Sequence, residues 1–277
     1  MVMTIAGQND QPVVLTIAGF DPSGGAGTIA DVRTFVAFDC NPTAAITSLT
    51  FQNSEGVFGA IHESAESLRA QILPIVQESR IAAIKTGMLP TRAIILEVAR
   101  LIQETNLPAP VVDPVLRSTS GYELMEADAM EVLLAELVPL ARVITPNIPE
   151  AERLTNLRIE DEEGMRAAAR RLRELGARAV LIKGGHLRRR SEVGDRRSEQ
   201  DSNQAIDVLD DEGNVTVFRG EWIDAPPVRG TGCMLSSAIA ACLGKGAHLK
   251  DSVGLAKQFV TDAIRNSRNI EPKTVNL

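Results

Sequence analysis

The chain has 277 residues, of which 44% are hydrophobic and 23% charged, a mixture that supplies a large apolar core. The formal net charge of −7 argues against a nucleic-acid-binding surface, because such surfaces carry an excess of basic residues. Cys40, Cys233 and Cys242 are too few and too widely spaced for a disulfide framework or a zinc site. No run is apolar enough to span a membrane and no signal peptide is seen, so we expect a cytoplasmic protein without membrane or nucleic-acid partners.

Short β-branched runs alternate with amphipathic stretches along the chain. We predict strands over residues 13–19, 43–52, 57–61, 81–85, 109–112, 143–144, 179–182, 205–209 and 215–219. Helices are predicted over 28–38, 64–77, 91–104, 127–137, 163–175, 234–243 and 250–268. This alternation is typical of a mostly parallel sheet with helices on both faces. We therefore expect one α/β domain over 1–277, in which the mixed-charge run 188–203 is a flexible loop, either without a role or serving as a lid.

A glycine-rich loop at 20–27 separates the first predicted strand from the first predicted helix, which is the layout of phosphate-binding loops. The P-loop pattern fails, because Gly27 is followed by Thr28 and Ile29 instead of Lys and Ser or Thr. A dinucleotide fingerprint matches literally at 25–30, but the second strand lacks the acidic residue that holds the ribose. A nicotinamide cofactor is therefore disfavoured.

A second glycine loop, Arg229-Gly230-Thr231-Gly232-Cys233, runs into a helix of small and apolar residues. A helix that begins on a glycine loop presents unpaired backbone N–H groups and a partial positive charge to whatever lies before it. Phosphate is a common occupant of such a position. A glycine turn leading into a core helix explains the same residues without a ligand. Residues elsewhere in the chain are needed to choose between an anion site and a simple turn.

Polar residues follow several of the predicted strands, where ligands bind in open parallel sheets. They are Asp113, Thr145, Asn147, Glu150 and Lys183. Phosphoryl transfer needs a phosphate cradle, a divalent metal, cations near the nucleotide and a placed acceptor hydroxyl. Asp113 and Glu150 suit Mg²⁺, directly or through its waters, and Lys183 can reach a phosphate. Each residue also has an ordinary structural explanation, but their coincidence at equivalent strand ends favours a kinase site.

A series of motifs resembles, in order, the hydroxymethylpyrimidine/phosphomethylpyrimidine kinases of thiamine synthesis. They lie at 15–27, 49–53, 85–89, 111–115, 144–152, 183–186 and 230–237. The resemblance implies a ribokinase-like fold, which is a three-layer α/β/α arrangement with a mostly parallel central sheet. It also implies ATP with Mg²⁺ and two successive phosphorylations of a pyrimidine. We further expect a small-molecule substrate and a homodimer.

The resemblance assigns candidate binding residues. It places the pyrimidine-binding glutamine at Gln52, whose amide can pair with the donor and acceptor edge of an aminopyrimidine. It implies that Gly19, Asp31 and Met88 line the substrate pocket. On the nucleotide side it implies an Mg²⁺–phosphate site at Asn147 and Glu150, and we expect Lys183, Asn147 and Thr145 to bind the nucleotide, with Asp113 and Glu150 at the metal.

Cys233 stands where sugar kinases of the same fold carry an aspartate as general base. We expect it to be catalytic together with Gly230, Thr231 and Gly232, with its pKa lowered by the helix N-terminus. A buried structural cysteine is the alternative. Arg229 stands where the family often has histidine, and we hypothesise that it holds a substrate phosphate bidentately.

Two other functions stay open. A pyridoxal-type kinase is the nearest, because its substrate also bears a hydroxymethyl group on a heteroaromatic ring, and Gln52 favours the aminopyrimidine without excluding pyridoxal. A binding or regulatory protein without catalytic activity is the second, and the presence of Cys233, Lys183, Asp113 and Glu150 argues against it.

Overall fold

The computed structural model describes residues 11–185, 204–223 and 228–267. The strands are β1 (Val13–Phe20), β2 (Asn41–Gln52), β3 (Val57–His62), β4 (Ile81–Thr86), β5 (Val111–Val112), β6 (Val143–Ile144), β7 (Ala179–Lys183), β8 (Gln204–Asp211) and β9 (Asn214–Glu221). The helices are α1 (Gly27–Ala37), α2 (Ala65–Glu78), α3 (Arg92–Glu104), α4 (Ala129–Val132), η1 (Leu133–Leu137), η2 (Val138–Leu140), α5 (Ile148–Thr155), α6 (Glu162–Glu174), α7 (Thr231–Gly244) and α8 (Leu249–Ser267). The charged run 188–203 lies outside the described residues.

The described strands form one sheet in the order β3-β2-β1-β4-β5-β6-β7-β8-β9. Pairing is parallel from β2 through β1, β4, β5 and β6 to β7. At the two ends, β3, β8 and β9 join by antiparallel pairing. The chain winds outward from β1 to β3 and then returns to β4, so the strand order reverses beside β1, where open α/β sheets bind ligands. The continuous sheet supports the proposal of a single domain.

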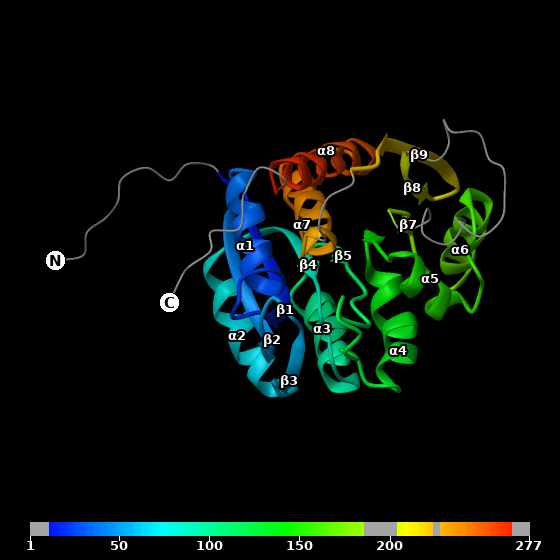
Figure 1. Cartoon of the computed structure of the whole chain (residues 1–277). Coiled ribbons are helices and arrows are strands. Elements are labelled where there is room, and N and C mark those ends of the chain that lie inside the picture. The colour runs from blue at the N-terminus through cyan, green and yellow to red at the C-terminus, as the bar shows by residue number, and fades with distance from the viewer. Residues whose placement is uncertain (1–10, 186–203, 224–227, 268–277) are drawn as a thin grey trace, which may run out of the picture.

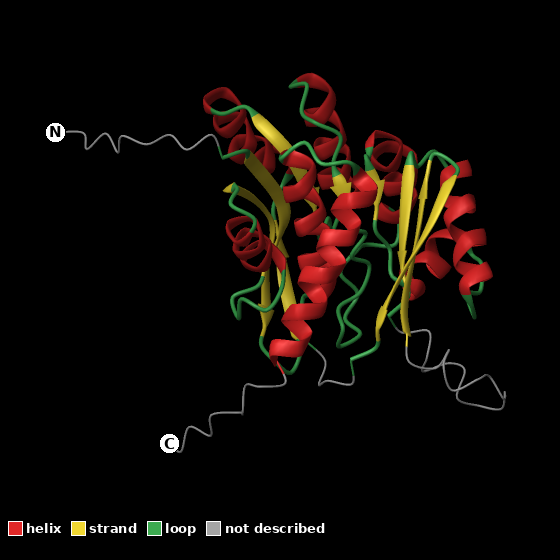
Figure 2. Cartoon of the chain, turned by 90° about the horizontal axis from the view of Figure 1, so that it is seen from above, coloured by secondary structure: helices red, strands yellow, loops and turns green. Residues whose placement is uncertain are grey.

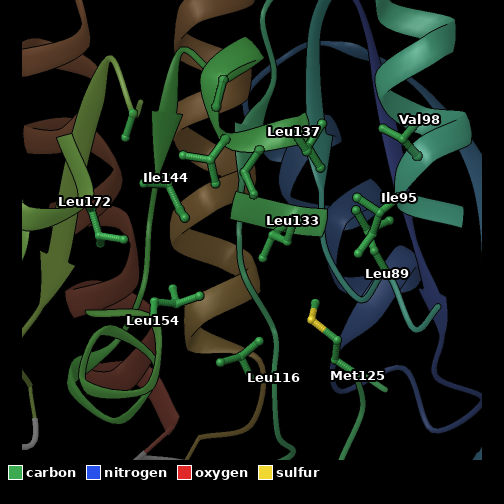
Figure 3. Packing of buried hydrophobic residues seen from close by; sticks show 14 of the residues in the cluster. Leu89, Ile95, Val98, Leu116, Met125, Leu133, Leu137, Ile144, Leu154 and Leu172 are labelled. Atoms are coloured by element: carbon green, nitrogen blue, oxygen red, sulfur yellow. The ribbon is translucent and has the colours of Figure 1, made fainter. Parts of the chain in front are cut away.

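Helices cover both faces of this sheet, as Figures 1 and 2 show. Leu15 and Ile17 of β1 face one apolar cluster while Val14 faces the other, the alternation expected of a strand buried on both sides. The first cluster packs under α2, α3, α4, α5 and α6, and part of it is drawn in Figure 3. The second packs under α7 and α8, with α1 beside them. The expected three-layer ribokinase-like architecture is confirmed.

Local differences from the predicted elements have physical causes. The helix predicted over 127–137 is a short α-turn followed by the π-helical η1 and the 3-10 turn η2. The strand predicted over 109–112 is reduced to Val111 and Val112, because Pro110 has no N–H to donate in a central strand. The eight-residue helix α5 is not predicted from the sequence; it begins at Ile148 and carries Pro149 in its first turn. Within the described residues, no helix combines the length and apolarity needed to cross a bilayer.

Candidate active site

Asp113 is the centre of a polar cluster at the carboxyl edge of the sheet. It follows β5 directly and is 2% exposed. Lys183, which ends β7, places its Nζ 2.8 Å from Asp113 Oδ1, and Thr145 Oγ1 lies 3.3 Å from the same oxygen. Ser236 Oγ of α7 lies 3.4 Å from Oδ2. The predicted strand-end residues therefore meet, and α7 brings a hydroxyl to the same carboxylate.

The first turn of α5 brings Glu150 to this cluster. Asn147 Oδ1 accepts from Glu150 N–H at 2.9 Å, and Glu150 Oε2 accepts from Asn147 N–H at 2.8 Å, which is a reciprocal capping box. Lys183 N–H donates to Pro146 O at 2.9 Å, so the cap is fastened to the end of β7. The Asn-x-x-Glu spacing thus has a structural reason, because each side chain accepts a hydrogen bond from the other residue's backbone N–H. It also places Glu150 at the site.

The pKa values of Glu150 and Asp113 are shifted in opposite directions. Burial raises the pKa of Glu150 to about 7, Lys183 opposes this shift and Asp113 adds to it. Burial also acts to raise the pKa of Asp113, but the ammonium groups of Lys183 and Lys85 outweigh it, and the pKa is lowered. Around these residues, the described chain has no cluster of three or more acidic, histidine or cysteine side chains that could hold a metal alone. A carboxylate pair suits Mg²⁺, which binds through one or two carboxylates together with substrate phosphates.

Two glycines, Gly230 and Gly232, leave the backbone open at the start of α7 and form a cradle there. Gly230 has φ +75°, and a Cβ there would lie 2.1 Å from Gly25 O, so the two glycine loops pack backbone against backbone. Gly230 caps α7 without a side-chain hydrogen bond, which leaves the first N–H groups for a ligand. A Cβ at Gly232 would lie 3.3 Å from Lys183 Nζ and 4.0 Å from Asp113 Oδ2. The cradle therefore adjoins the Asp113–Lys183 pair and fits a phosphoryl group.

Cys233 lies half-buried in the first turn of α7. Burial raises the pKa of its thiol to about 11, although the Lys85 ammonium opposes the shift, and Asp31 and Asp113 add to it. The expected lowering of this pKa is therefore wrong for the protein without ligands, because the loss of hydration is the largest influence on it. At neutral pH the group is a thiol that can donate a hydrogen bond.

Other predicted pocket residues lie beside the end of β1. Gly19 contacts Met88, since a Cβ at Gly19 would be 3.0 Å from Met88 Sδ. Gln52 ends β2, where its Oε1 accepts from Arg229 Nη2 at 3.0 Å and its Nε2 donates to Thr50 Oγ1 at 2.7 Å. These residues border the point at which the strand order reverses.

Asp31 lies beneath the site and is fully buried. Its Oδ2 accepts from Thr16 Oγ1 at 2.6 Å and its Oδ1 accepts from Ser237 Oγ at 2.7 Å. Lys85 Nζ lies 2.9 and 2.8 Å from the two oxygens. The carboxylate thus joins β1, β4 and α7. No role is predicted for Lys85 from the sequence, although a lysine within a buried strand signals a carboxylate partner.

The chain is similar to known kinases over most of its length. The family model described as phosphomethylpyrimidine kinase matches residues 21–276. A hydroxymethylpyrimidine/phosphomethylpyrimidine kinase of Streptomyces coelicolor is 40% identical over 91% of this chain and 88% of its own. The crystal structure of phosphomethylpyrimidine kinase from Clostridium difficile 630 matches with a TM-score of 0.77 and 37% identity, covering 92% of this chain and 100% of that one.

The pyridoxal kinase from Staphylococcus aureus, solved in complex with AMP-PCP and pyridoxal, has a TM-score of 0.80 at 30% identity. That match covers 92% of this chain and 88% of the other. Both kinds of vitamin kinase therefore share the fold, while the family model and the curated relatives confirm the resemblance found in the motifs. The chain belongs to the phosphomethylpyrimidine kinase family.

Proposed function

We propose that this protein is an ATP- and Mg²⁺-dependent kinase of thiamine biosynthesis. It phosphorylates the hydroxymethyl group of hydroxymethylpyrimidine and then the resulting monophosphate. The observation that carries this proposal is the glycine-framed N-terminus of α7 beside the Asp113–Lys183 pair, with Gln52 and Cys233 on the substrate side. The family membership agrees with this assignment.

The proposed site residues divide into a nucleotide-binding group and a substrate-binding group. On the nucleotide side, Lys183, Thr145 and Asn147 bind ATP phosphates, and Asp113 and Glu150 hold Mg²⁺ directly or through its waters. The metal, when bound, neutralises charge on the phosphate oxygens. The N–H groups of Thr231, Gly232 and Cys233 face the transferring phosphoryl group and stabilise the charge on it. The Asp113–Lys183 contact of 2.8 Å keeps this ammonium in place before a nucleotide arrives.

On the substrate side, Gln52 pairs with the ring, and Gly19 and Met88 line the pocket around it. Asp31 is fully buried and supports the pocket from beneath through Thr16, Ser237 and Lys85. Cys233 touches the acceptor hydroxyl. A loose transition state does not require the acceptor to lose its proton early, so a protonated thiol is compatible with this role. We expect Cys233→Ala to lower kcat by roughly 10²–10⁴ without unfolding the protein, the range of a positioned proton-transfer group. Wild-type turnover in this variant would remove Cys233 from the mechanism.

Pyridoxal kinase activity is the second candidate, favoured by the similarity to the pyridoxal kinase from Staphylococcus aureus. A panel of hydroxymethylpyrimidine, its monophosphate and pyridoxal, assayed for ATP turnover, separates the candidates. Turnover with the first two supports the proposal, and turnover with pyridoxal alone replaces it by the second candidate. Binding of the pyrimidine with no ATP turnover on any of them would indicate a binding protein instead.

We also propose a homodimer. Leu49 and Ile61 are paired across β2 and β3 on one face of the sheet edge, and they are 40% and 58% exposed. Phe51, on the same face, is 50% exposed. Apolar patches of this kind mark association surfaces. Sedimentation should give twice the chain mass for the wild type and a shift toward monomer for Phe51→Glu; a monomeric wild type would contradict the proposal.

A cytoplasmic location is proposed as well. The three cysteines are free, which suits a reducing compartment. Fractionation of the native host tests it, with recovery of the protein outside the cytoplasm as the contrary result.

A further inference from the structure

Arg229, the residue before the α7 cap, connects two loops that border the site. Its Nη2 lies 3.0 Å from Gln52 Oε1 and 3.2 Å from Asp21 Oδ2. Its Nη1 lies 3.1 Å from Ser23 Oγ and also donates to Asn53 O. The guanidinium therefore fastens the first glycine loop to the end of β2.

The glycine-loop side of this connection is rigid. Asp21 is 1% exposed and is held by its own loop, because Oδ1 accepts from Ser23 N–H at 2.8 Å and from Ser23 Oγ at 2.6 Å. Its Oδ2 accepts from Ala26 N–H at 2.9 Å in addition to Arg229. A phosphate that used Arg229 bidentately would have to displace Asp21 or Gln52. The guanidinium is thus placed to act on Gln52.

Two neighbours fix the same orientation of the Gln52 amide. A guanidinium can only donate, so the amide atom that faces Arg229 has to be the oxygen. Thr50 donates its hydroxyl hydrogen to Phe20 O at 2.8 Å, so its oxygen is left to accept from the amide nitrogen. If the Gln52 amide were flipped, its N–H group would face the N–H groups of Arg229. Its oxygen would face the oxygen of Thr50, whose hydroxyl hydrogen is already donated to Phe20 O.

We propose that Arg229 is a positioning residue that locks the Gln52 amide and so makes the site select a ring edge with an amino donor beside a nitrogen acceptor. The inference rests on the proposed function. An amide has two N–H hydrogens and an oxygen with two lone pairs, and Thr50 and Arg229 each use one. One donor and one acceptor remain, in a fixed order. An aminopyrimidine edge complements that order.

A pyrimidinone edge, with a carbonyl beside a ring N–H, has the reverse order. It would bring N–H against N–H and oxygen against oxygen, and reversing the amide would break the contacts with Arg229 and Thr50. Gln52 is half-buried, and a bound ring would cover its amide. We therefore expect the wild type to prefer the aminopyrimidine over the matching pyrimidinone by roughly fivefold to 150-fold, which corresponds to about 1–3 kcal/mol for an unpaired polar group.

The test compares the Kd values of hydroxymethylpyrimidine and its pyrimidinone analogue by calorimetric titration of the full chain. Arg229→Met keeps much of the apolar stem and removes the donors, and Thr50→Val removes the acceptor on the other side. Arg33→Met is the matched control, because Arg33 Nη1 bonds Gly24 O of the same glycine loop. We expect the Kd ratio to fall several-fold in each of the first two variants, to approach about one in their double variant, and to stay unchanged in Arg33→Met.

An unchanged ratio in Arg229→Met, or an equal fall in Arg33→Met, would overturn the inference. If Arg229→Met does not fold, Arg229→Lys and Thr50→Val decide the same point, because lysine retains a donor and should keep more selectivity than Thr50→Val. Phosphate transfer is measured separately. A protein that binds the pyrimidine but transfers no phosphate would remove the proposed function, while the Kd ratio would still decide the role of Arg229.

Discussion

Replacing Lys85 by methionine removes the cation that faces Asp31 in the interior of the fold. Both side chains are 0% exposed, and Nζ lies 2.8 Å from Oδ2. Removing one partner of a buried pair costs about 3–5 kcal/mol, because the remaining charge is left without compensation. Asp31 keeps the hydroxyl groups of Thr16 and Ser237 at 2.6 and 2.7 Å. Because these two hydroxyl groups still stabilise the carboxylate, we expect the loss of unfolding free energy to lie near the lower end of the 3–5 kcal/mol range, at about 3 kcal/mol.

The assay is urea unfolding followed by circular dichroism near neutral pH. Burial acts to lower the pKa of Lys85, but Asp31 outweighs it and the pKa is raised. A raised lysine pKa gives a stability contribution that is complete below the ordinary pKa of 10.5 and is lost only as pH rises through the folded value, so neutral pH reports the full effect. The double variant Lys85→Met/Asp31→Asn leaves no lone charge and should lose less than the single variant. A single-variant loss under about 1 kcal/mol, or a double-variant loss equal to the sum of the single ones, would refute this reasoning.

Further predictions concern Cys233 and Glu150. With a pKa of about 11 in place of the ordinary 9.0, Cys233 should react with iodoacetamide about a hundredfold more slowly than a free thiol near neutral pH; mass spectrometry of the labelled peptide measures this, and a free-thiol rate contradicts it. Glu150→Gln should raise the unfolding free energy of the metal-free protein by about 1–3 kcal/mol in mildly alkaline solution and leave it unchanged in acid. The reason is that the folded pKa of about 7 lies above the ordinary 4.5, so ionisation within the fold destabilises it as pH rises between these values. Equal stability of the two proteins in alkaline solution with EDTA would count against it.

The sequence was sufficient for the parts of the site that follow from strand order. Asp113 and Thr145 each follow a strand and Lys183 ends one, and parallel strands bring their carboxyl ends to one edge, so the convergence of these residues could be predicted without coordinates. Partners across the fold could not be predicted in that way. The Lys85–Asp31 and Arg229–Gln52 contacts join residues 54 and 177 positions apart, on elements whose relative placement depends on the packed core.

The pKa of Cys233 shows a second limit. Its position at a helix N-terminus can be read from the sequence, and this position by itself predicts a lowered pKa. The loss of hydration raises the pKa instead, and it depends on how α7 packs against α1 and the sheet. The local influence could therefore be predicted from the sequence, whereas the larger influence of burial could not.

Helix α7 links the two halves of the site through consecutive residues. Ser236 Oγ lies 3.4 Å from Asp113 Oδ2 on the proposed nucleotide side, although Gly232 O and Cys233 O of its own helix are closer, at 3.1 and 3.0 Å. Ser237 donates to Asp31 on the proposed substrate side. Cys233 lies one turn before Ser237 on the same helix, and the phosphate cradle is the N-terminus of that helix. The proposed phosphate cradle, the proposed acceptor contact Cys233 and the two serines beside the carboxylates therefore belong to one helix. Because a shift of α7 would move the cradle and Cys233 together, substitutions at Ser236 or Ser237 should disturb the two binding sites jointly, although each serine contacts only one of the carboxylates.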